Sequence, residues 1–478
     1  MRATRRPDLR LSVILVVAAL GVACGRPPSP TGSGEAGTAA PPPSGDTLVL
    51  RNFTLIDGTE RPPVPDAAMV VEAGRISWVG PAADLRAPDD ATTRNLNGAF
   101  VMPGLIDLHG HLGNTVDLVQ DRKFHTRDSA EKDLKTYASY GVTTILSMGT
   151  DQDTIFAVRD EQRRQGVAGD GALKSGRPSM ARVYTAGQGL MLEGGYGGLA
   201  GVNKAVATPE AAAAEVNAQI DKGADIIKLW LDSELGTMPK MPPEMTQAII
   251  DAAHQRNRRV VAHVFYLEDA KRLVEQGIDG FVHSVRDQPV DQALIDGMKQ
   301  RGTWQVAATL SREAAMFAYG STPDFASDPF FTKGVSAATL DLIRSPERQK
   351  TIASGAHFAE YPAFFEQAKA NLKRLADAGI PFGMGTDAGP PGRFPGYSAH
   401  WELELMVEAG LTSAQAIAAA TRRGAEFLGA AEVGTLEAGN WADFVVLDAD
   451  PLASIRNTRT IRAVYVAGTQ APSINQDQ

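Results

Sequence analysis

The stretch Val101-Met-Pro-Gly-Leu-Ile-Asp-Leu-His-Gly-His111 predicts a buried strand that leads into two histidines. Successive side chains on a strand point to opposite faces, so His109 and His111 share one face. Neutral imidazole is a common ligand for zinc and related metals. One such pair is weak evidence for a metal site, because buried histidines also serve in packing. The rest of the chain has to decide between these explanations.

Further candidate ligands lie in or after short apolar runs. They are Lys228 within 224–231, His263 in 260–264, His283 in 280–284 and Asp387 after 381–385. Taken singly, each has a structural explanation: a packed histidine, a lysine whose head group reaches solvent, or a turn-forming aspartate. Lysine is rarely buried without a partner, and burial favours its neutral amine. Their repeated occurrence on strands favours one shared metal site.

Between residues 103 and 432, strand-like and helix-like runs alternate. After the first strand, the strand-like runs are 142–148, 182–186, 226–231, 260–264, 280–284, 304–310 and 381–385; the helix-like runs include 209–222, 242–256, 267–276 and 364–378. Eight strands with intervening helices predict an α/β fold, a (β/α)8 TIM barrel. Every candidate ligand except Lys228 lies at the C-terminal end of its strand, the face on which such barrels carry active sites.

The segments on either side of the predicted barrel are rich in short strand-like runs separated by turn residues. Residues 46–102 and 433–470 predict one small β-sandwich domain with the barrel inserted between them. Within the barrel, residues 311–361 are too long for an ordinary loop and carry many aromatic side chains. Two interpretations of this insertion are compatible: a helical subdomain that packs on itself, or a lid over the barrel mouth.

Residues 1–23 have the pattern of a signal peptide, with arginines before an apolar run that is too short to span a bilayer easily. Cys24 resembles a bacterial lipoprotein acceptor, and residues 24–45 form a Pro/Gly/Ser-rich tether. Gly21 stands where such signals usually carry leucine, so ordinary cleavage after Ala23 is the alternative. Both alternatives predict a periplasmic protein, with membrane contact only through a lipid on Cys24.

Composition excludes several classes of function. The net charge of −9 gives no electrostatic support for nucleic-acid binding. Cys24 is the only cysteine, so the chain has no internal disulfide and its barrel has neither a thiolate ligand nor a cysteine nucleophile.

The series His109, His111, Lys228, His263, His283 and Asp387 resembles the ligand set of the amidohydrolase superfamily, in particular its members with two metals bridged by a carboxylated lysine. The passages 101–107 and 434–448 are also similar to that superfamily. The resemblance covers roughly residues 46–470. The tract around Lys228 and the helix 402–421 are most similar to the imidazolonepropionase and Xaa-Pro dipeptidase branch.

The resemblance implies two divalent metal ions and a carboxylated Lys228. His109, His111 and Asp387 would hold one metal, and His263 and His283 the other, with Lys228 shared. A nitrogen and oxygen ligand set suits zinc best, while manganese, iron and cobalt remain open. Two metals can clamp a bridging hydroxide and polarise a carbonyl. Asp387 would act as general base and then as general acid.

Contacts to the substrate are suggested by position. Tyr196 lies in a glycine-rich loop after the third strand, Arg286 and Arg312 follow strands and suit a carboxylate, and His400 begins the helix after the last strand. Surface salt bridges are the alternative for the two arginines. Dipeptidase relatives tend to have histidine and glycine after the third strand, where this chain has Ala186-Gly-Gln188-Gly189. This departure argues against a strict prolidase assignment.

The sequence therefore predicts a metal-dependent amidohydrolase that hydrolyses a carbon–nitrogen amide bond of a small molecule, a dipeptide or an N-acyl amino acid. A mononuclear deaminase or cyclic amidase of the same superfamily is the first alternative. A solute-binding lipoprotein without catalysis is the second, and the full ligand set argues against it. Homo-oligomer formation stays open.

Overall fold

The computed structural model describes residues 47–164 and 180–473. The described residues belong to one compact unit. The predicted signal peptide 1–23, the lipid acceptor Cys24 and the tether 24–45 lie outside the described residues. Among the described helices, none is both long and apolar enough to cross a membrane.

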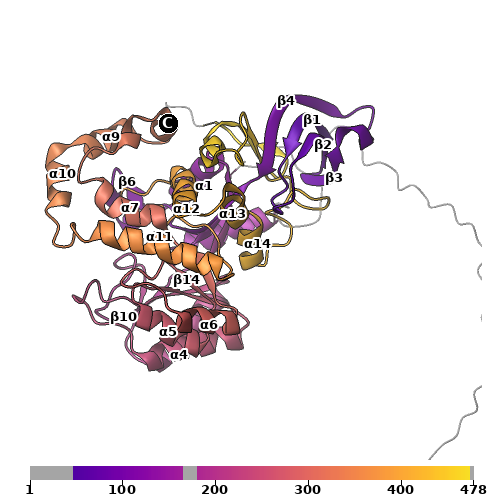
Figure 1. Ribbon diagram of the computed structural model, residues 1–478. Coiled ribbons are helices and arrows are strands. Elements are labelled where there is room, and N and C mark those ends of the chain that lie inside the picture. Colours follow the sequence, from indigo (N-terminus) through magenta and orange to yellow (C-terminus); the bar gives the residue numbers. More distant parts are fainter. Residues whose placement is uncertain (1–46, 165–179, 474–478) are drawn as a thin grey trace, which may run out of the picture. The chain divides into compact units, whose positions relative to one another are not determined.

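Strands from both ends of the chain build one seven-stranded sheet, in the order β18-β17-β16-β4-β1-β2-β3. Figure 1 shows β1–β4 beside one another. The strands are β1 Leu48–Leu55, β2 Val64–Glu72, β3 Arg75–Pro81, β4 Thr92–Pro103, β16 Phe444–Leu447, β17 Ile461–Val466 and β18 Thr469–Gln470. The register pairs Val446 of β16 with Val101 of β4. The two ends therefore share a sheet, while the finer prediction of a two-sheet sandwich is not confirmed.

The region between the two ends contains two parallel sheets, β5-β8-β9 and β11-β10-β12-β13-β14-β15, and a small hairpin β6-β7. Their bounds are β5 Leu105–Gly110, β6 Thr115–Val116, β7 Val119–Gln120, β8 Val142–Ser147, β9 Arg182–Thr185, β10 Leu190–Leu192, β11 Lys204–Val206, β12 Ile227–Trp230, β13 Val260–His263, β14 Gly280–Val282 and β15 Trp304–Ala307. β5, β8 and β12–β14 are buried on both faces, as expected for parallel strands covered by helices.

The predicted eighth strand, 381–385, is not a regular strand. It makes only isolated bridges, Gln305 with Phe382 and Gly110 with Ala388. Its backbone nevertheless bonds to both neighbours: Gly383 N donates to Gln305 O at 3.1 Å, and Leu108 N donates to the carbonyl oxygen of Met384 at 2.9 Å. Segment 381–388 therefore lies between β15 and β5, where the last strand was expected.

Helices follow most of these strands (Figure 1). They are α1 Arg127–Ser139, α2 Asp153–Gln162, α3 Pro209–Asp221, α4 Pro243–Gln255, α5 Leu267–Gln276, α6 Gln292–Arg301, α7 Leu310–Ala318, α8 Pro329–Thr332, α9 Ala337–Arg344, α10 Pro346–Ala353, α11 Tyr361–Asp377, α12 Tyr397–Glu408, α13 Ser413–Ala419 and α14 Arg422–Leu428. Short 3-10 helices occupy Ala82–Asp84, Arg122–Phe124, Asp324–Ser327 and Ile455–Arg459. Helix α3 begins where Thr208 accepts a hydrogen bond from Ala211 N and Pro209 fixes the first turn.

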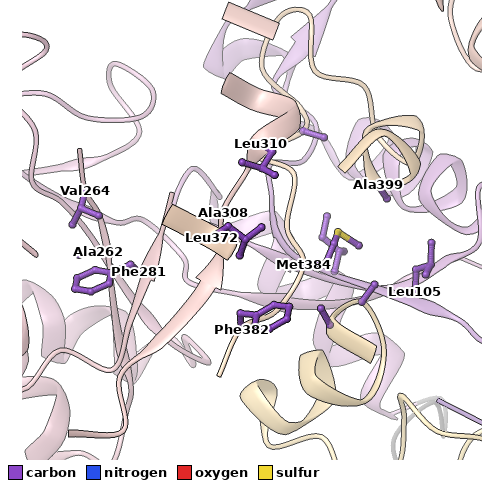
Figure 2. Close-up of a cluster of buried hydrophobic side chains, with 14 of the residues drawn as sticks. Leu105, Ala262, Val264, Phe281, Ala308, Leu310, Leu372, Phe382, Met384 and Ala399 are labelled. Atoms are coloured by element: carbon purple, nitrogen blue, oxygen red, sulfur yellow. The ribbon is translucent and has the colours of Figure 1, made fainter. Parts of the chain in front are cut away.

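A continuous apolar core joins the helices to the strands. Figure 2 shows part of it, with Phe382 and Met384 of the irregular segment drawn together with Leu105 of β5 and Phe281 of β14. These side chains are almost fully buried. Packing of this kind holds segment 381–388 in place although its strand pairing is sparse.

The insertion 311–361 is helical. Tyr319, Phe331 and Ile343 form a separate buried cluster with Tyr140 and Tyr397. The cluster includes Tyr140 and Tyr397 from outside the insertion, so the insertion also packs against the neighbouring helices, and both interpretations of it stay predictions. The aromatic side chains of the cluster contact one another, whereas the ring contacts of the metal-ligand candidates involve other histidines and Tyr196.

Candidate metal centre

Four candidate histidines lie together. The ring centroids of His109 and His111 are 5.3 Å apart, those of His109 and His283 are 4.9 Å apart, and those of His263 and His283 are 4.2 Å apart. All four residues are buried. Strands β5, β13 and β14 run parallel to their neighbours in the two sheets, so their C-terminal ends deliver these rings to one place.

Two members of the cluster have unusual backbone conformations. His283 has φ of 92° and Asp387 has φ of 56°, and Thr309, which contacts His283, has φ of 55°. A left-handed conformation is uncommon for residues other than glycine and costs free energy that the surrounding structure must supply. Such outliers are found at functional sites as well as in turns, and three of the fourteen among the described residues lie at or beside the predicted ligands.

Lys228 is buried inside β12 and its Nζ has no hydrogen-bond partner among the described residues. The nitrogen lies 5.1 Å from the centroid of the Trp230 ring. Burial lowers the pKa of Lys228 to about 7, although the charge of Asp387 opposes the change. A neutral amine is a nucleophile, so the state that carbamate formation requires is accessible near neutral pH.

Glycines leave room for the Lys228 and Trp230 side chains. A Cβ atom at Gly149 would lie 3.0 Å from Lys228 Cγ, and one at Gly189 would lie 2.4 Å from Trp230 Cζ3. Gly189 belongs to the tract in which this chain departs from the dipeptidase pattern. Its lack of a side chain is therefore needed for the packing of this pair.

Hydrogen bonds select which nitrogen of each histidine faces the cluster. His111 Nδ1 lies 2.7 Å from Thr150 Oγ1, and His283 Nδ1 lies 2.7 Å from Thr309 Oγ1. His263 instead uses Nε2, which lies 2.8 Å from Asp232 Oδ2. The first two rings therefore offer Nε2 to a metal and His263 offers Nδ1.

Asp387 joins the histidines. Its Oδ1 lies 2.9 Å from His111 Nε2 and 3.6 Å from His109 Nε2. Burial alone would raise the pKa of Asp387, but the charge of Arg393 and the nearby histidines lower it well below its usual range. Asp387 is therefore an anion, the state needed for a metal ligand and for a base.

The residues fit a metal centre. His109, His283 and Asp387 place one ligand atom each within 4.8 Å of one another. His109 Nδ1, like Lys228 Nζ, is buried without a hydrogen-bond partner. Burial lowers the pKa of His109, His263 and His283, which keeps these imidazoles neutral and able to donate electron pairs.

Of the four predicted substrate contacts, the structure brings two to the cluster. The Tyr196 ring centroid lies 5.1 Å from that of His263. Arg312 Nε lies 3.8 Å from Asp387 Oδ2. Both residues are thus placed to contact a substrate bound at the ligands.

The other two predictions need correction. Arg286 is buried and its Nη1 donates to Val264 O and Ser284 O, while its Nε lies 3.1 Å from Glu313 Oε2. His400 is also buried, with Nδ1 2.9 Å from Thr458 Oγ1 and Nε2 2.7 Å from the carbonyl oxygen of Tyr140. Both ring nitrogens of His400 are therefore used inside the fold. Arg286 is paired with Glu313, while its Nε has no hydrogen-bond partner among the described residues.

Asp107, on the same strand as the histidine pair, accepts hydrogen bonds from the backbone of His109 and from Thr386. Its carboxylate therefore ties β5 to segment 381–388 and is not among the ligand atoms that converge.

Asp232, Arg393 and Glu313 are functional candidates that the sequence did not reveal. Asp232 follows β12 and orients His263. The Arg393 guanidinium contacts Asp387 Oδ2 directly. Asp232 follows the lysine strand by two residues and Arg393 follows Asp387 by six, so each stood close to a predicted ligand. Charged residues in such loops are common, and only the folded chain shows which of them turn inward.

Comparison with known proteins agrees with this geometry. The amidohydrolase family model matches residues 100–471, and a model of the bacterial imidazolonepropionase-like composite domain matches residues 67–87. The chain belongs to the amidohydrolase family, in its imidazolonepropionase-like branch. It has a TIM-barrel-like α/β fold and is a hydrolase that acts on carbon–nitrogen bonds.

Individual relatives are distant. The imidazolonepropionase of Paracoccus denitrificans is 25% identical over 406 residues, which cover 80% of this chain and 88% of that protein. The imidazolonepropionase of Deinococcus radiodurans is 25% identical over 429 residues, covering 85% and 92%. A solved Xaa-Pro dipeptidase with methionine bound in its active site has a TM-score of 0.68 at 21% identity, covering 89% of this chain and 99% of that one. The last similarity shows the fold alone.

Proposed function

We propose that the protein is a binuclear metal-dependent amidohydrolase that cleaves an amide bond in a dipeptide or an N-acyl amino acid. The observation that carries this proposal is the convergence of four neutral histidines with the anionic Asp387, close to which lies an unpartnered buried lysine. Packing alone does not explain why His109 Nδ1 and Lys228 Nζ are buried without hydrogen-bond partners.

We assign His109, His111 and Asp387 to one metal, and His263 and His283 to the other. Carboxylated Lys228 would be shared, and zinc suits these donors best. Two divalent ions held there would polarise the substrate carbonyl and activate water at neutral pH. His283, assigned to the second metal, has a ligand atom within 4.8 Å of ligand atoms of His109 and Asp387, which are assigned to the first. This short distance supports two adjacent metal ions.

The remaining chemistry belongs to the chain itself. Asp387 accepts the proton from the attacking water and delivers it to the leaving nitrogen. Arg393 keeps its carboxylate ionised in the absence of substrate. The Tyr196 ring is tilted by 51° to the His263 ring at 5.1 Å, which supports a place beside the substrate, where its hydroxyl would serve as a contact. Burial of the whole group excludes water that would weaken these electrostatic contacts.

A second candidate is a mononuclear cyclic amidase. Two observations favour it: the ligand atoms that lie closest together come from His109, His283 and Asp387 alone, and His263 is already paired with Asp232. The curated relatives described above are imidazolonepropionases. This enzyme would hold one ion per chain and leave Lys228 unmodified.

We also propose that the two parallel sheets and segment 381–388 close into a (β/α)8 barrel. Asp225 N, just before β12, donates to Thr185 O of β9 at 2.8 Å, and segment 381–388 bonds to both β15 and β5. These bonds support a continuous ring. A crystal structure with a solvent gap between β9 and β12 would contradict it.

The function is tested with metal-reconstituted protein, a panel of dipeptides, N-acyl amino acids and cyclic amides, and measurement of metal content. We expect hydrolysis of the linear amides, two ions per chain, and a carbamate carbon signal after exchange with isotopically labelled bicarbonate. One ion, no carbamate and turnover of cyclic amides would select the second candidate. Full activity after complete metal removal would overturn both.

A further inference from the structure

Three arginines and three acids lie at or beside the predicted metal ligands. Arg286 is buried, and the side chains of Arg312 and Arg393 are 12% and 19% exposed. The acids are Glu313, Asp387 and Asp232, which interacts electrostatically with Arg286. The charges of this group are formally balanced, so the binding of an anion depends on guanidinium donors that the acids leave unused.

Arg286 is not one of the arginines that approach Asp387. It donates Nη1 to two backbone carbonyls, and its Nε lies 3.1 Å from Glu313 Oε2 without making a hydrogen bond. Its guanidinium also lies 4.5 Å from the centroid of the Phe265 ring. Arg286 therefore holds Glu313 in position, and Glu313 in turn holds Arg312.

Arg312 and Arg393 retain donors that the described contacts leave unused. Arg312 gives Nη1 to both carboxylate oxygens of Glu313, at 2.9 and 3.0 Å, while its Nε is buried without a hydrogen-bond partner. Arg393 contacts Asp387 through Nη1. The Arg393 loop is closed by a hydrogen bond from Gly389 N to Arg393 O, which fixes the start of the side chain.

The two arginines approach the same atom. Arg393 Nη1 contacts Asp387 Oδ2, and Arg312 Nε lies 3.8 Å from that oxygen. Their guanidinium groups therefore converge beside the residue to which we assign proton delivery. Planar guanidinium groups match carboxylate oxygens in pairs, which makes this an arrangement suited to a carboxylate.

We propose that Arg312 and Arg393 form the binding site for the carboxylate of the amino acid whose nitrogen leaves. This inference rests on the proposed amide hydrolysis and specifies its substrate class: amides formed by the amino group of an amino acid with a free α-carboxylate. Asp387 protonates the leaving nitrogen, and in an amino acid the α-carboxylate lies two bonds from that nitrogen. An anion-binding pair adjacent to Asp387 is thus at the matching place, and internal amides of longer peptides are excluded.

Direct binding tests the proposal without relying on turnover. Metal-reconstituted wild-type protein is titrated calorimetrically with L-alanine and with L-alaninamide, which differ only in the carboxylate and have no N-acyl bond to hydrolyse. We expect the carboxylate ligand to bind about a hundredfold more tightly, a ratio typical of a buried charge pair. Arg312→Met and Arg393→Met should each reduce this ratio to below about tenfold by weakening the carboxylate ligand alone. Arg256→Met, on an exposed arginine of another surface, is the matched control and should keep the ratio.

Arg393→Lys guards against misfolding, because it keeps the charge while losing the paired geometry; we expect an intermediate ratio. Equal affinity for the two ligands in wild type, or an unchanged ratio in both methionine variants with normal metal content, would overturn the carboxylate site. The amide-hydrolase proposal fails separately. A protein that discriminates between the ligands yet hydrolyses no linear amide would retain this site and lose that function.

Discussion

Asp232 Oδ2 lies 2.8 Å from His263 Nε2, and both side chains are almost completely buried. Burial lowers the pKa of His263 to about 4, against the effect of Asp232, so the imidazole is neutral and donates its Nε2 proton to the carboxylate. Burial alone would raise the pKa of Asp232, but His263 and Arg286 lower it to about 2. The pair therefore fixes one tautomer and leaves Nδ1 for a metal.

Asp232→Asn should weaken metal binding at His263 while leaving the fold intact. The amide can donate to His263 and so favour the wrong tautomer. We expect a decrease of about 10–100-fold in the affinity for one metal and a similar loss of activity. Metal titration followed by elemental analysis measures it, with Asp251→Asn on the exposed face of α4 as the control. Unchanged affinity would show that Asp232 does not select the tautomer.

Lys228→Met should separate stability from function. The methionine side chain has a similar length without an amine that burial leaves unpartnered. We expect the free energy of unfolding of the metal-free protein to rise by about 1–3 kcal/mol, while hydrolysis falls by orders of magnitude. Denaturant unfolding and rate measurements on the same preparation check both. In Lys228→Ala, short carboxylic acids should partly restore activity by replacing the carbamate. Near-normal activity of either variant without such acids would show that Lys228 only packs.

Metal loading should depend on pH through Lys228. With a pKa of about 7, the amine is about nine-tenths neutral at pH 8 and about one-tenth neutral at pH 6. Only the neutral amine captures carbon dioxide. The capture step releases a proton from the amine nitrogen to solvent. At constant dissolved carbon dioxide, the carbamate should therefore form at about a tenfold higher rate at pH 8 than at pH 6.

The histidines do not obscure that measurement, because the lowered pKa values of His109, His263 and His283 keep them neutral across this range. The same lysine affects stability with a defined sign. Its pKa falls from 10.5 to about 7 on folding, so the unfolded chain binds more protons between these values. The stability of metal-free protein should fall as the pH decreases from about 10 to about 7. Lys228→Met should lack both effects.

The sequence identified the histidines, Lys228 and Asp387 as candidate metal ligands because each lies in or directly after a short apolar run that is easily recognised as a strand. Alternation between strands and helices likewise located β8, β12 and β13 to within a residue or two. It did not show that segment 381–388 pairs irregularly, since that depends on tertiary packing and not on local preference.

The contacts of long polar side chains were harder to predict. Arg286 and Arg312 both follow strands and look alike in the sequence. In the structure, Arg286 donates Nη1 to two backbone carbonyls, whereas Arg312 reaches Asp387. His400 lies on the buried face of α12. Its Nε2 contacts the carbonyl oxygen of Tyr140 and not the predicted metal ligands. Their roles depend on distances between elements remote in the chain, which residue spacing does not encode.

Arg182→Met should destabilise the link between the barrel strand β9 and the seven-stranded sheet. Arg182 donates Nε and Nη2 to the two carboxylate oxygens of Asp443, at 2.7 and 3.0 Å, and both residues are buried. Removal of the arginine leaves a buried charge, so we expect the free energy of unfolding to fall by about 3–5 kcal/mol. Arg256→Met, which breaks an exposed pair with Asp221, should cost less than about 1 kcal/mol. Denaturant unfolding compares them, and equal losses would contradict a structural role for the buried pair.

Asp387→Asn should separate metal binding from proton transfer. Asparagine keeps the shape and one oxygen ligand but is a far poorer base. We therefore expect metal content to fall modestly and turnover to fall by about 10²–10⁴-fold.

The Asp387→Asn variant also removes the negative charge that Arg393 contacts. If that contact only stabilised the fold, Arg393→Met would reproduce the loss of stability without the loss of turnover. The alternative for Asp387 is a turn former, for which asparagine is an adequate replacement. An Asp387→Asn enzyme with normal turnover would leave only the turn.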